Sequence, residues 1–379
     1  MKKYINQQDM KQANAADVFG LIRARGQVTR KQLEQWTNLS WGAVSNITAR
    51  LIQSGYIVET KPEKIEGAGA GRTPSYLAVN EAEHFCIGLD INSSGLQAVV
   101  VNLQNKIVKT LSKPADFRRK DILLSDIYKL TDAIVQTAGG HHILGIGIAM
   151  QGQVDALNGV SVSLPHCKDW AQVPLGSLVS ERFGLPVLVE HDPNCILYAQ
   201  SAGTKTENVI LLRVDNGIGM AVMLEGSIFD RPGMFELGHI CAVPNGAPCS
   251  CGKKGCLEAY ASQEGMARRY GKPFDRLAAA AKNGESKAVL LFEDMAAQLA
   301  AAICNASTLL HIKNIVLCGD MWRYQDLFYD KFLHCVQAIS GDNPPSFSVT
   351  DVENAAFGAA LIAVERSVKH IRVGKDDNK

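Results

Sequence analysis

The chain has 379 residues, of which 46% are hydrophobic and 20% are charged, and its formal net charge is +1. This length predicts two or three domains with ordinary globular cores. No run approaches the roughly 18 uninterrupted apolar residues of a membrane-spanning helix, and the charged first residues have no apolar segment behind them of the kind found in a secretory signal. We therefore expect a cytoplasmic protein with no membrane insertion.

The small net charge hides an asymmetry between the first 80 residues and the rest. Residues 1–80 hold eleven Lys or Arg and six Asp or Glu, a balance of +5, so the remainder of the chain carries −4. A basic module on a mildly acidic body indicates an anionic partner for the first part only.

This basic module carries the pattern of three short helices. Apolar residues recur at helical spacing over residues 14–25. Thr29 is placed to cap a second short helix, whose inner face we expect to hold Leu33 and Trp36. After a three-residue turn, Ser40 is placed to cap a third helix, so the second and third helices form a helix-turn-helix.

We expect the third helix to bury one side in the core of the module and to expose the other side to solvent. Its inward stripe is Val44, Ile47 and Leu51. The outward residues, none of them acidic, are Trp41, Ser45, Asn46, Thr48 and Arg50. A helix that enters the major groove needs such donors and small polar groups near its amino end. We interpret it as a DNA-recognition helix, and a three-helix bundle with a solvated polar face is the alternative.

Two short strands are expected after the third helix. Residues 56–60 alternate like a strand, and residues 76–79 resemble its hairpin partner. The glycine-rich loop between them would be the wing, in which Arg72 is a candidate contact to phosphate or minor groove, although a plain domain linker would look similar. The pattern predicts a winged helix-turn-helix DNA-binding domain over residues 1–80.

From residue 81 onward the pattern is that of an α/β body. Strands are indicated at 85–91, 96–103, 106–111, 143–149 and 185–190, with a helix at 122–137. A similar series restarts at residue 209, which predicts a duplicated second lobe and a ligand cleft between the halves. We expect one effector domain over 81–379, with lobe one at about 81–200 plus the C-terminal helix and lobe two at about 201–355.

Three motifs in this body resemble one family. They are Gly145-Ile146-Gly147-Ile148-Ala149 leading to Gly152-Gln153-Val154-Asp155, then Glu190-His191-Asp192-Pro193-Asn194, and Glu236-Leu237-Gly238-His239 followed by Cys249-Ser250-Cys251-Gly252-Lys253-Lys254-Gly255-Cys256-Leu257-Glu258. With these motifs the chain resembles the ROK family (repressors, open reading frames and kinases) over essentially its whole length. The resemblance implies a two-lobed actin/hexokinase-like α/β fold.

Three cysteines, Cys249, Cys251 and Cys256, cluster in one tight glycine-rich loop. In a reducing compartment clustered cysteines more often bind a metal than form disulfides. A closed tetrahedral site needs a fourth ligand, for which His239 is the candidate. Thiolates with one imidazole suit zinc better than calcium or magnesium, so we expect a structural zinc. Three loose cysteines in a polar loop are the alternative.

The resemblance implies a sugar site at Asp192, Glu236, His239 and Glu258, with His191 in the position where family kinases usually carry Asn and repressors often carry His. Carboxylates suit vicinal hydroxyls because each accepts two charge-assisted hydrogen bonds. The expected zinc would brace the segments that carry Glu236 and Glu258. A surface salt bridge by either glutamate is the alternative.

The loops that would bind ATP depart from the kinase pattern. In family kinases the residue matching Asp192 is the base that takes a proton from the sugar hydroxyl. The first phosphate loop should read Asp-x-Gly-Gly-Thr, and this chain has Asp90-Ile91-Asn92-Ser93-Ser94. Residues 215–219 keep only part of a second glycine run, and the adenosine-side cluster is reduced to residues 318–320. We interpret the body as a former kinase that still holds sugar.

The sequence thus predicts a sugar-responsive transcription factor that represses carbohydrate-use genes. It would bind inverted-repeat operator DNA as a homodimer or a dimer of dimers, and it would respond to a sugar or sugar phosphate. Two alternatives stay open: an ATP-dependent sugar kinase with a DNA-binding appendage, and a regulator controlled by a transport protein instead of a sugar.

Overall fold

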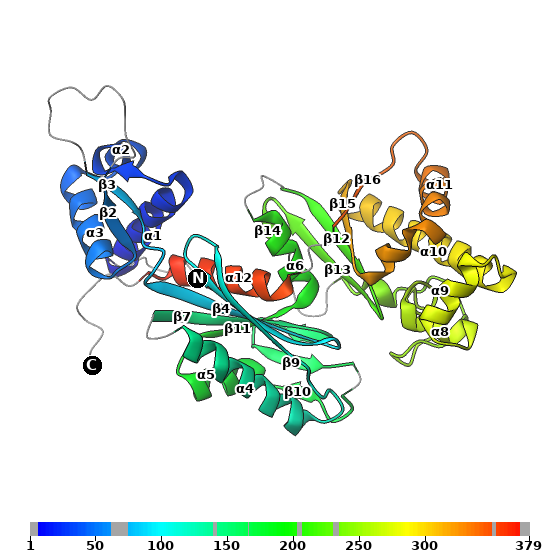
Figure 1. The fold of residues 1–379 in the computed structure, drawn as a ribbon. Coiled ribbons are helices and arrows are strands. Elements are labelled where there is room, and N and C mark those ends of the chain that lie inside the picture. Colours follow the sequence, from blue (N-terminus) through cyan, green and yellow to red (C-terminus); the bar gives the residue numbers. More distant parts are fainter. Residues whose placement is uncertain are drawn as a thin grey trace. The chain divides into compact units, whose positions relative to one another are not determined.

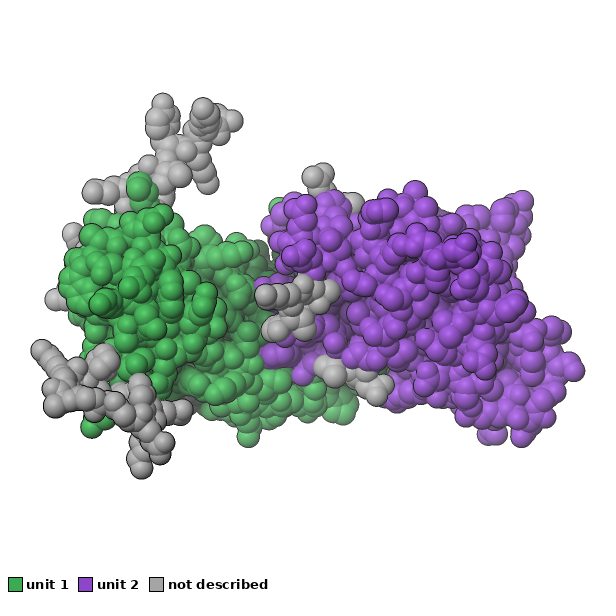
Figure 2. All heavy atoms as spheres, turned by 90° about the horizontal axis from the view of Figure 1, so that it is seen from above, with its two compact units in different colours: residues 1–154, 158–190, 359–379 green, residues 155–157, 191–358 purple. Residues whose placement is uncertain are grey.

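The computed structural model describes residues 7–61, 75–138, 142–165, 167–202, 207–229, 235–350 and 354–371. The chain forms two compact units, coloured separately in Figure 2. Unit 1 comprises residues 1–154, 158–190 and 359–379, and unit 2 comprises residues 155–157 and 191–358. Unit 1 therefore combines the amino-terminal module with the first lobe and most of the C-terminal helix.

Three helices and a three-stranded antiparallel sheet form the amino-terminal part of unit 1 (Figure 1). The helices are α1 (Gln7–Arg25), α2 (Arg30–Trp36) and α3 (Trp41–Gln53), and the strands are β1 (Val28–Thr29), β2 (Ile57–Thr60) and β3 (Tyr76–Val79), in the order β1-β3-β2. The side chains of Thr29 and Ser40 accept hydrogen bonds from backbone N–H groups in the first turns of α2 and α3, as predicted. Two helices joined by a short turn and followed by a hairpin match the predicted order of elements, and β1 adds a strand that was not predicted. The segment between β2 and β3 that was predicted as the wing lies outside the described residues, and we refer to the described part as the winged helix.

Two orientations predicted for these helices are wrong. Thr48, expected on the outer face of α3, is fully buried; its hydroxyl donates to the Val44 carbonyl at 2.9 Å and accepts from Nε of Arg30 at 3.0 Å. Because its hydroxyl is used inside the fold, Thr48 is not a DNA contact. Trp36, expected on the inner face of α2, is 41% exposed, and the guanidinium of Arg25 lies 5.0 Å from its ring centroid.

A five-stranded sheet forms the first lobe, in the order β11-β7-β4-β5-β6. Its strands are β4 (His84–Asn92), β5 (Gly95–Asn102), β6 (Ile107–Lys113), β7 (His142–Met150) and β11 (Val187–His191). Helices α4 (Lys120–Thr137) and α5 (Leu175–Phe183) lie on one side of it and α12 (Ala355–Lys369) on the other (Figure 1). A small sheet of β8 (Gln153–Asp155), β9 (Val160–Ser163) and β10 (Ala171–Val173) completes the lobe.

The winged helix and the first lobe share one hydrophobic core. Its members from the winged helix include Phe19, Ile22, Leu33, Val44, Leu51, Ile57 and Leu77. The same cluster contains Cys86 and Leu103 of the first lobe and Ala363, Val364 and Val368 of α12. Burial of this apolar surface joins the two parts directly.

Helix α12 packs against the sheet over a glycine. A Cβ atom at Gly147 in β7 would lie 2.0 Å from the carbonyl oxygen of Ala359, so only glycine allows this approach. Farther along α12, Glu365 pairs with Arg23 of α1 at 2.7 Å, and Arg23 also donates to the side-chain oxygen of Asn105 at 2.5 Å. The first and last helices of the protein are thus tied to each other.

Unit 2 is built on a second five-stranded sheet, in the order β14-β13-β12-β15-β16. Its strands are β12 (Val209–Val214), β13 (Ile218–Leu224), β14 (Ser227–Ile228), β15 (Asn314–Cys318) and β16 (Ser346–Val349). Strand β12 pairs antiparallel with β13 and parallel with β15, just as β4 pairs with β5 and β7 in unit 1. This repetition confirms the restart predicted at residue 209.

Helices and turns surround this second sheet (Figure 1). They are α6 (Asp192–Ser201), η1 (Leu237–His239), α7 (Glu258–Ala261), α8 (Gln263–Tyr270), α9 (Phe274–Lys282), α10 (Ser286–Leu310), η2 (Asp320–Leu327) and α11 (Tyr329–Ser340). By length and composition α10 could cross a membrane, but 56% of its most apolar stretch is buried inside the protein. Phe292, Met295 and Leu299 place it in the core of unit 2, which accounts for its apolar character.

Candidate metal centre and polar pocket

Four potential metal ligands converge beside η1 in unit 2. Nδ1 of His239 lies 3.7 Å from Sγ of Cys249, and Sγ of Cys251 lies 3.7 Å from Sγ of Cys256. One ligand atom from each of these residues lies within 4.8 Å of all the others. A tetrahedron with metal–sulfur bonds of about 2.3 Å places its sulfur atoms about 3.8 Å apart. The structure therefore brings together all four predicted ligands in a geometry that fits a four-coordinate metal ion.

The backbone of the cysteine loop is held in place by close contacts. Cys241 and Cys256 form an antiparallel bridge, and the N–H of Gly255 donates to the carbonyl of Ala247 at 2.8 Å. Gly255 has a φ of +78°, and a Cβ atom there would lie 1.8 Å from the carbonyl oxygen of Val243. A side chain at this position would displace the loop and separate the ligands.

Burial disfavours the thiolate form of two cysteines in this cluster. Burial raises the pKa of Cys249, and it raises the pKa of Cys256 to about 12. Without a cation these two sulfurs would be protonated at neutral pH, whereas metal binding requires thiolates. A bound metal ion would supply the charge that stabilises these two sulfurs as thiolates.

Glu258, at the start of α7, lies directly beside the cluster. Its Oε1 accepts hydrogen bonds from the hydroxyl of Ser250 at 3.2 Å and from the thiol of Cys249 at 3.7 Å. Its Oε2 accepts from the backbone N–H of Ile218 at 3.2 Å. A Cβ atom at Gly217 would lie 2.9 Å from the same oxygen, so the glycine leaves room for the carboxylate. The cysteine loop and the start of β13 together fix the position of Glu258.

Glu236 and His239 lie at the two ends of η1. The backbone N–H of His239 donates to the carbonyl of Glu236 at 2.9 Å, and both residues are half-buried. The short turn therefore connects a candidate sugar ligand, Glu236, to a metal ligand, as the sequence predicts.

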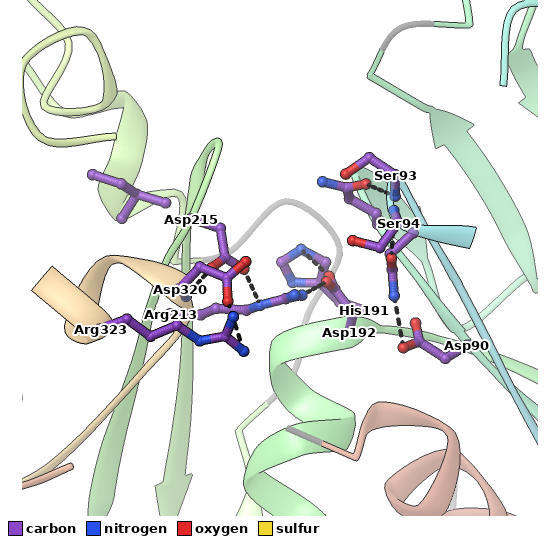
Figure 3. A network of polar contacts seen from close by, with 12 residues as sticks. Asp90, Ser93, Ser94, His191, Asp192, Arg213, Asp215, Asp320 and Arg323 are labelled. Carbon is purple, nitrogen blue, oxygen red and sulfur yellow. Dashed lines mark hydrogen bonds and ion pairs between the residues drawn. The ribbon is translucent and has the colours of Figure 1, made fainter. Parts of the chain in front are cut away.

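The predicted kinase base is held by an arginine that sequence reasoning missed (Figure 3). Asp192, only 4% exposed, has its Oδ2 2.5 Å from Nη1 of Arg213, and Nε of Arg213 lies 2.7 Å from Oδ2 of Asp215. His191 lies on the other side of the carboxylate, with Nε2 3.6 Å from Oδ1 of Asp192. Asp215 also accepts a hydrogen bond from the backbone N–H of Asp320. The available signal was a single arginine within the apolar strand β12.

In unit 1, side chains form hydrogen bonds with the backbone of the loop predicted to correspond to the first phosphate loop. The amide of Asn92 donates to Asp90 at 2.8 Å, and its carbonyl oxygen accepts from the N–H of Ser94 at 2.8 Å (Figure 3). The N–H of Ser93 donates to the side chain of Gln151 at 2.9 Å. Two N–H groups of the kind that approach phosphate in a glycine loop are thus bonded within the protein.

The other predicted DNA contacts on α3 are accessible. Trp41 is 52% exposed, Asn46 and Arg50 are exposed, and Ser45 is half-buried. Arg72 lies outside the described residues.

The ROK family model matches residues 86–365, which is more than half of the chain. This chain belongs to the ROK family. The xylose repressor of Caldicellulosiruptor bescii is 26% identical over 351 residues, which are 85% of this chain and 86% of that protein.

Solved structures of ROK proteins share the fold. A ROK family transcriptional regulator described as a homologue of the Escherichia coli MLC protein has a TM-score of 0.78 at 23% identity, and the match covers 96% of this chain and 97% of that chain. A ROK hexokinase from Thermus thermophilus has a TM-score of 0.63 at 23% identity, and the match covers 73% of this chain and 97% of that chain. About three quarters of this ROK protein therefore matches nearly the whole length of a ROK hexokinase.

The ligand geometry predicts that this ROK protein holds a metal ion through its cysteine loop. Cys256→Ser should lose the metal and also weaken ligand binding at Glu258, because the loop that positions this carboxylate loses its cross-link. Elemental analysis of protein purified without chelator checks the metal content. Cys335→Ser in α11 is the matched control and should keep the metal. A wild-type protein with no bound metal would contradict the assignment.

Proposed function

We propose that this ROK protein is a sugar-responsive, DNA-binding repressor of carbohydrate-use genes. The observation that carries the proposal is the shared core of unit 1, in which a winged helix and the first lobe of a kinase-like body pack together. The proposed DNA-binding module therefore lies in the same compact unit as part of the effector domain. The similarity to a xylose repressor over 85% of the chain supports the same function.

We propose α3 as the recognition helix. Its exposed face presents Trp41, Ser45, Asn46 and Arg50 without any carboxylate, which suits the acceptor-rich edges of base pairs and the phosphates. Arg72 of the wing is a further proposed contact. A homodimer, or a dimer of dimers, would present two such helices to an inverted-repeat operator in the cytoplasm.

Arg50→Ala should weaken operator binding by about 1–3 kcal/mol, or roughly 5–150-fold, because a contact to a base edge or a phosphate is removed. Arg276→Ala in unit 2 also removes an exposed positive charge and should leave the affinity unchanged. Fluorescence anisotropy with labelled operator DNA measures both. Equal losses in the two variants would mean that only net charge matters, and α3 would not be the recognition helix.

We propose that the cysteine cluster holds a structural zinc and that the polar residues beside it bind a sugar or sugar phosphate. Three thiolates and an imidazole are the ligand set of closed zinc sites, which leave no position for substrate. The proposed sugar ligands are His191, Asp192, Glu236, His239 and Glu258. The carboxylates among them would accept hydrogen bonds from vicinal hydroxyls, which offset the cost of placing several carboxylates together.

The sugar should change operator affinity by roughly 5–150-fold, the usual range of regulatory coupling, and operator DNA should change sugar affinity by the same factor. Glu258→Gln should abolish the response and leave sugar-free DNA binding intact, while Glu264→Gln, an exposed carboxylate in α8, should behave as wild type. Titrations with hexoses, pentoses, amino sugars and their 6-phosphates measure this. If a sugar occupies the wild-type pocket without changing operator affinity, a transport protein becomes the better candidate effector.

We also infer that phosphoryl transfer has been lost. In this chain Arg213 pairs with one oxygen of Asp192, the residue that matches the kinase base, so part of that carboxylate is already engaged within the protein. Asp215 places a carboxylate, paired with Arg213, in the loop that would bind phosphates. The serine and asparagine side chains of residues 92–94 add bulk in the first loop.

The purified protein should therefore show no ATP turnover above background with any sugar that it binds. A coupled ADP-release assay measures this, and the ROK hexokinase of Thermus thermophilus serves as the positive control. Turnover of about 1 per second or more, in the usual range of enzymes, would instead identify this protein as a sugar kinase with a DNA-binding appendage.

A further inference from the structure

A cavity of about 850 Å³ lies in unit 1, at the junction of the winged helix with the first lobe. Ser54 and Tyr56, which follow α3, line it from the winged helix. Three strands of the first lobe line it at their amino ends, and α12 lines it with its last turns. Its volume lies within the range of about 300–1,000 Å³ that is typical of small-molecule pockets.

This cavity is separate from the kinase-like site. His84, which lines it, begins β4, whereas Asp90 of the degenerate phosphate loop lies near the other end of the same strand. Six residues of extended strand span about 20 Å. Ligands of open α/β sheets bind outside the carboxyl ends of the strands, so a pocket at the amino ends is a different site.

The polar lining of the cavity is basic. Arg366, His370 and His142, all of them exposed to solvent, contribute a guanidinium and two imidazoles. The carboxylate of Glu83 lies 3.5 Å from His142 and pairs with it. Within the described part of the chain, no carboxylate pairs with the side chain of Arg366 or of His370. The cavity therefore has positive charge to offer an anion.

A buried histidine in the lining has an unused hydrogen-bonding atom. His84 is 6% exposed, its ring stacks on Tyr56 with centroids 4.3 Å apart, and its Nε2 lies 2.7 Å from the carbonyl oxygen of Ser54. A carbonyl only accepts, so Nε2 carries the hydrogen. Burial lowers the pKa of His84, which leaves Nδ1 as a lone-pair acceptor. Among the described residues Nδ1 has no partner, although buried polar atoms usually find one.

Apart from Ser54 and Ser367, the rest of the lining is apolar. Ile143, Leu144, Ile146, Pro186, Val187, Leu188 and Ala363 form it, together with the ring of Tyr56. An apolar wall with a few converging polar groups is typical of a pocket for a small organic molecule and differs from a site for an inorganic ion.

We propose that this cavity is a second effector site, which binds a small organic anion with an apolar body and a hydroxyl or N–H donor. Arg366 binds the anionic group, the donor bonds to Nδ1 of His84, and the strand residues contact the apolar body. Because the ligand touches both the segment after α3 and helix α12, its binding favours one placement of α3 on the first lobe. The binding claim stands by itself, and the effect on DNA rests on the proposed function.

The test uses 6-hydroxyhexanoate as probe, with hexanoate and hexane-1,6-diol as matched ligands that lack the donor or the charge. Ligand-observed NMR on the full chain should show saturable binding with a Kd on the order of 1 mM for so small a molecule. Arg366→Gln should weaken it at least roughly tenfold, Leu188→Trp should block it by filling the cavity, and exposed Arg118→Gln should leave it unchanged. Both matched ligands should bind more weakly.

Each outcome decides one part of the proposal. No saturable binding, or binding that Arg366→Gln and Leu188→Trp leave unchanged while both variants melt like wild type, would overturn the site. Glu258→Gln should retain the probe, and loss of probe binding in that variant would place the probe in the polar pocket of unit 2. Saturable binding that leaves operator affinity unchanged would overturn the effector role. A protein that binds the probe but no operator DNA would refute the proposed function alone.

Discussion

The close packing of α12 on the first sheet is the constraint on which unit 1 depends. Gly147 lets the backbone of α12 approach β7, and this places Ala363, Val364 and Val368 where the winged helix needs apolar partners. A winged helix of this size has a small core of its own, and small cores are marginally stable. The last helix of the chain therefore completes the core of the first domain, and the junction cavity lies along the same helix.

The cysteine loop of unit 2 depends on a different principle from the core around it, because backbone contacts and the cluster of metal ligands hold it in place. The cysteine cluster, the bridge between Cys241 and Cys256 and the glycine at 255 fix a loop that has little apolar surface to bury. The position of Glu258 is fixed together with this loop, because Glu258 follows the last cysteine by two residues. Arg213 is held by two ion pairs, because a carboxylate lies within 2.7 Å of each of two of its nitrogens.

Much of the architecture could be predicted from local signals. Thr29 and Ser40 are recognisable caps because their hydroxyls meet a chemical need of every helix start, and the strands of both lobes are apolar runs of the right length. The metal ligands could be predicted because three of them lie within eight residues, and the family resemblance supplied His239 and the two glutamates.

The remaining features depend on partners that lie far away in the sequence. Helical spacing places Thr48 on the polar side of α3. Its hydroxyl is nevertheless bonded to the side chain of Arg30 and to the carbonyl of Val44 in the preceding helical turn. Trp36 is apolar enough for a core, yet α2 is too short to bury it, and Arg25 covers one face instead. The partners of Arg213 and the cavity beside His84 arise only when separate strands and helices are brought together, so the sequence offers at most a lone arginine in an apolar strand as a signal.

The shared core has a practical consequence for anyone who divides this protein into pieces. A fragment that begins near residue 81 would expose Cys86, Leu103, Ala363 and Val364, which are all buried under the winged helix in the intact chain. Such a contiguous apolar patch promotes self-association and precipitation. The isolated winged helix would expose the complementary surface and lose part of its stability. Crystallisation and binding work on the body alone would therefore need polar replacements on the exposed side of α12.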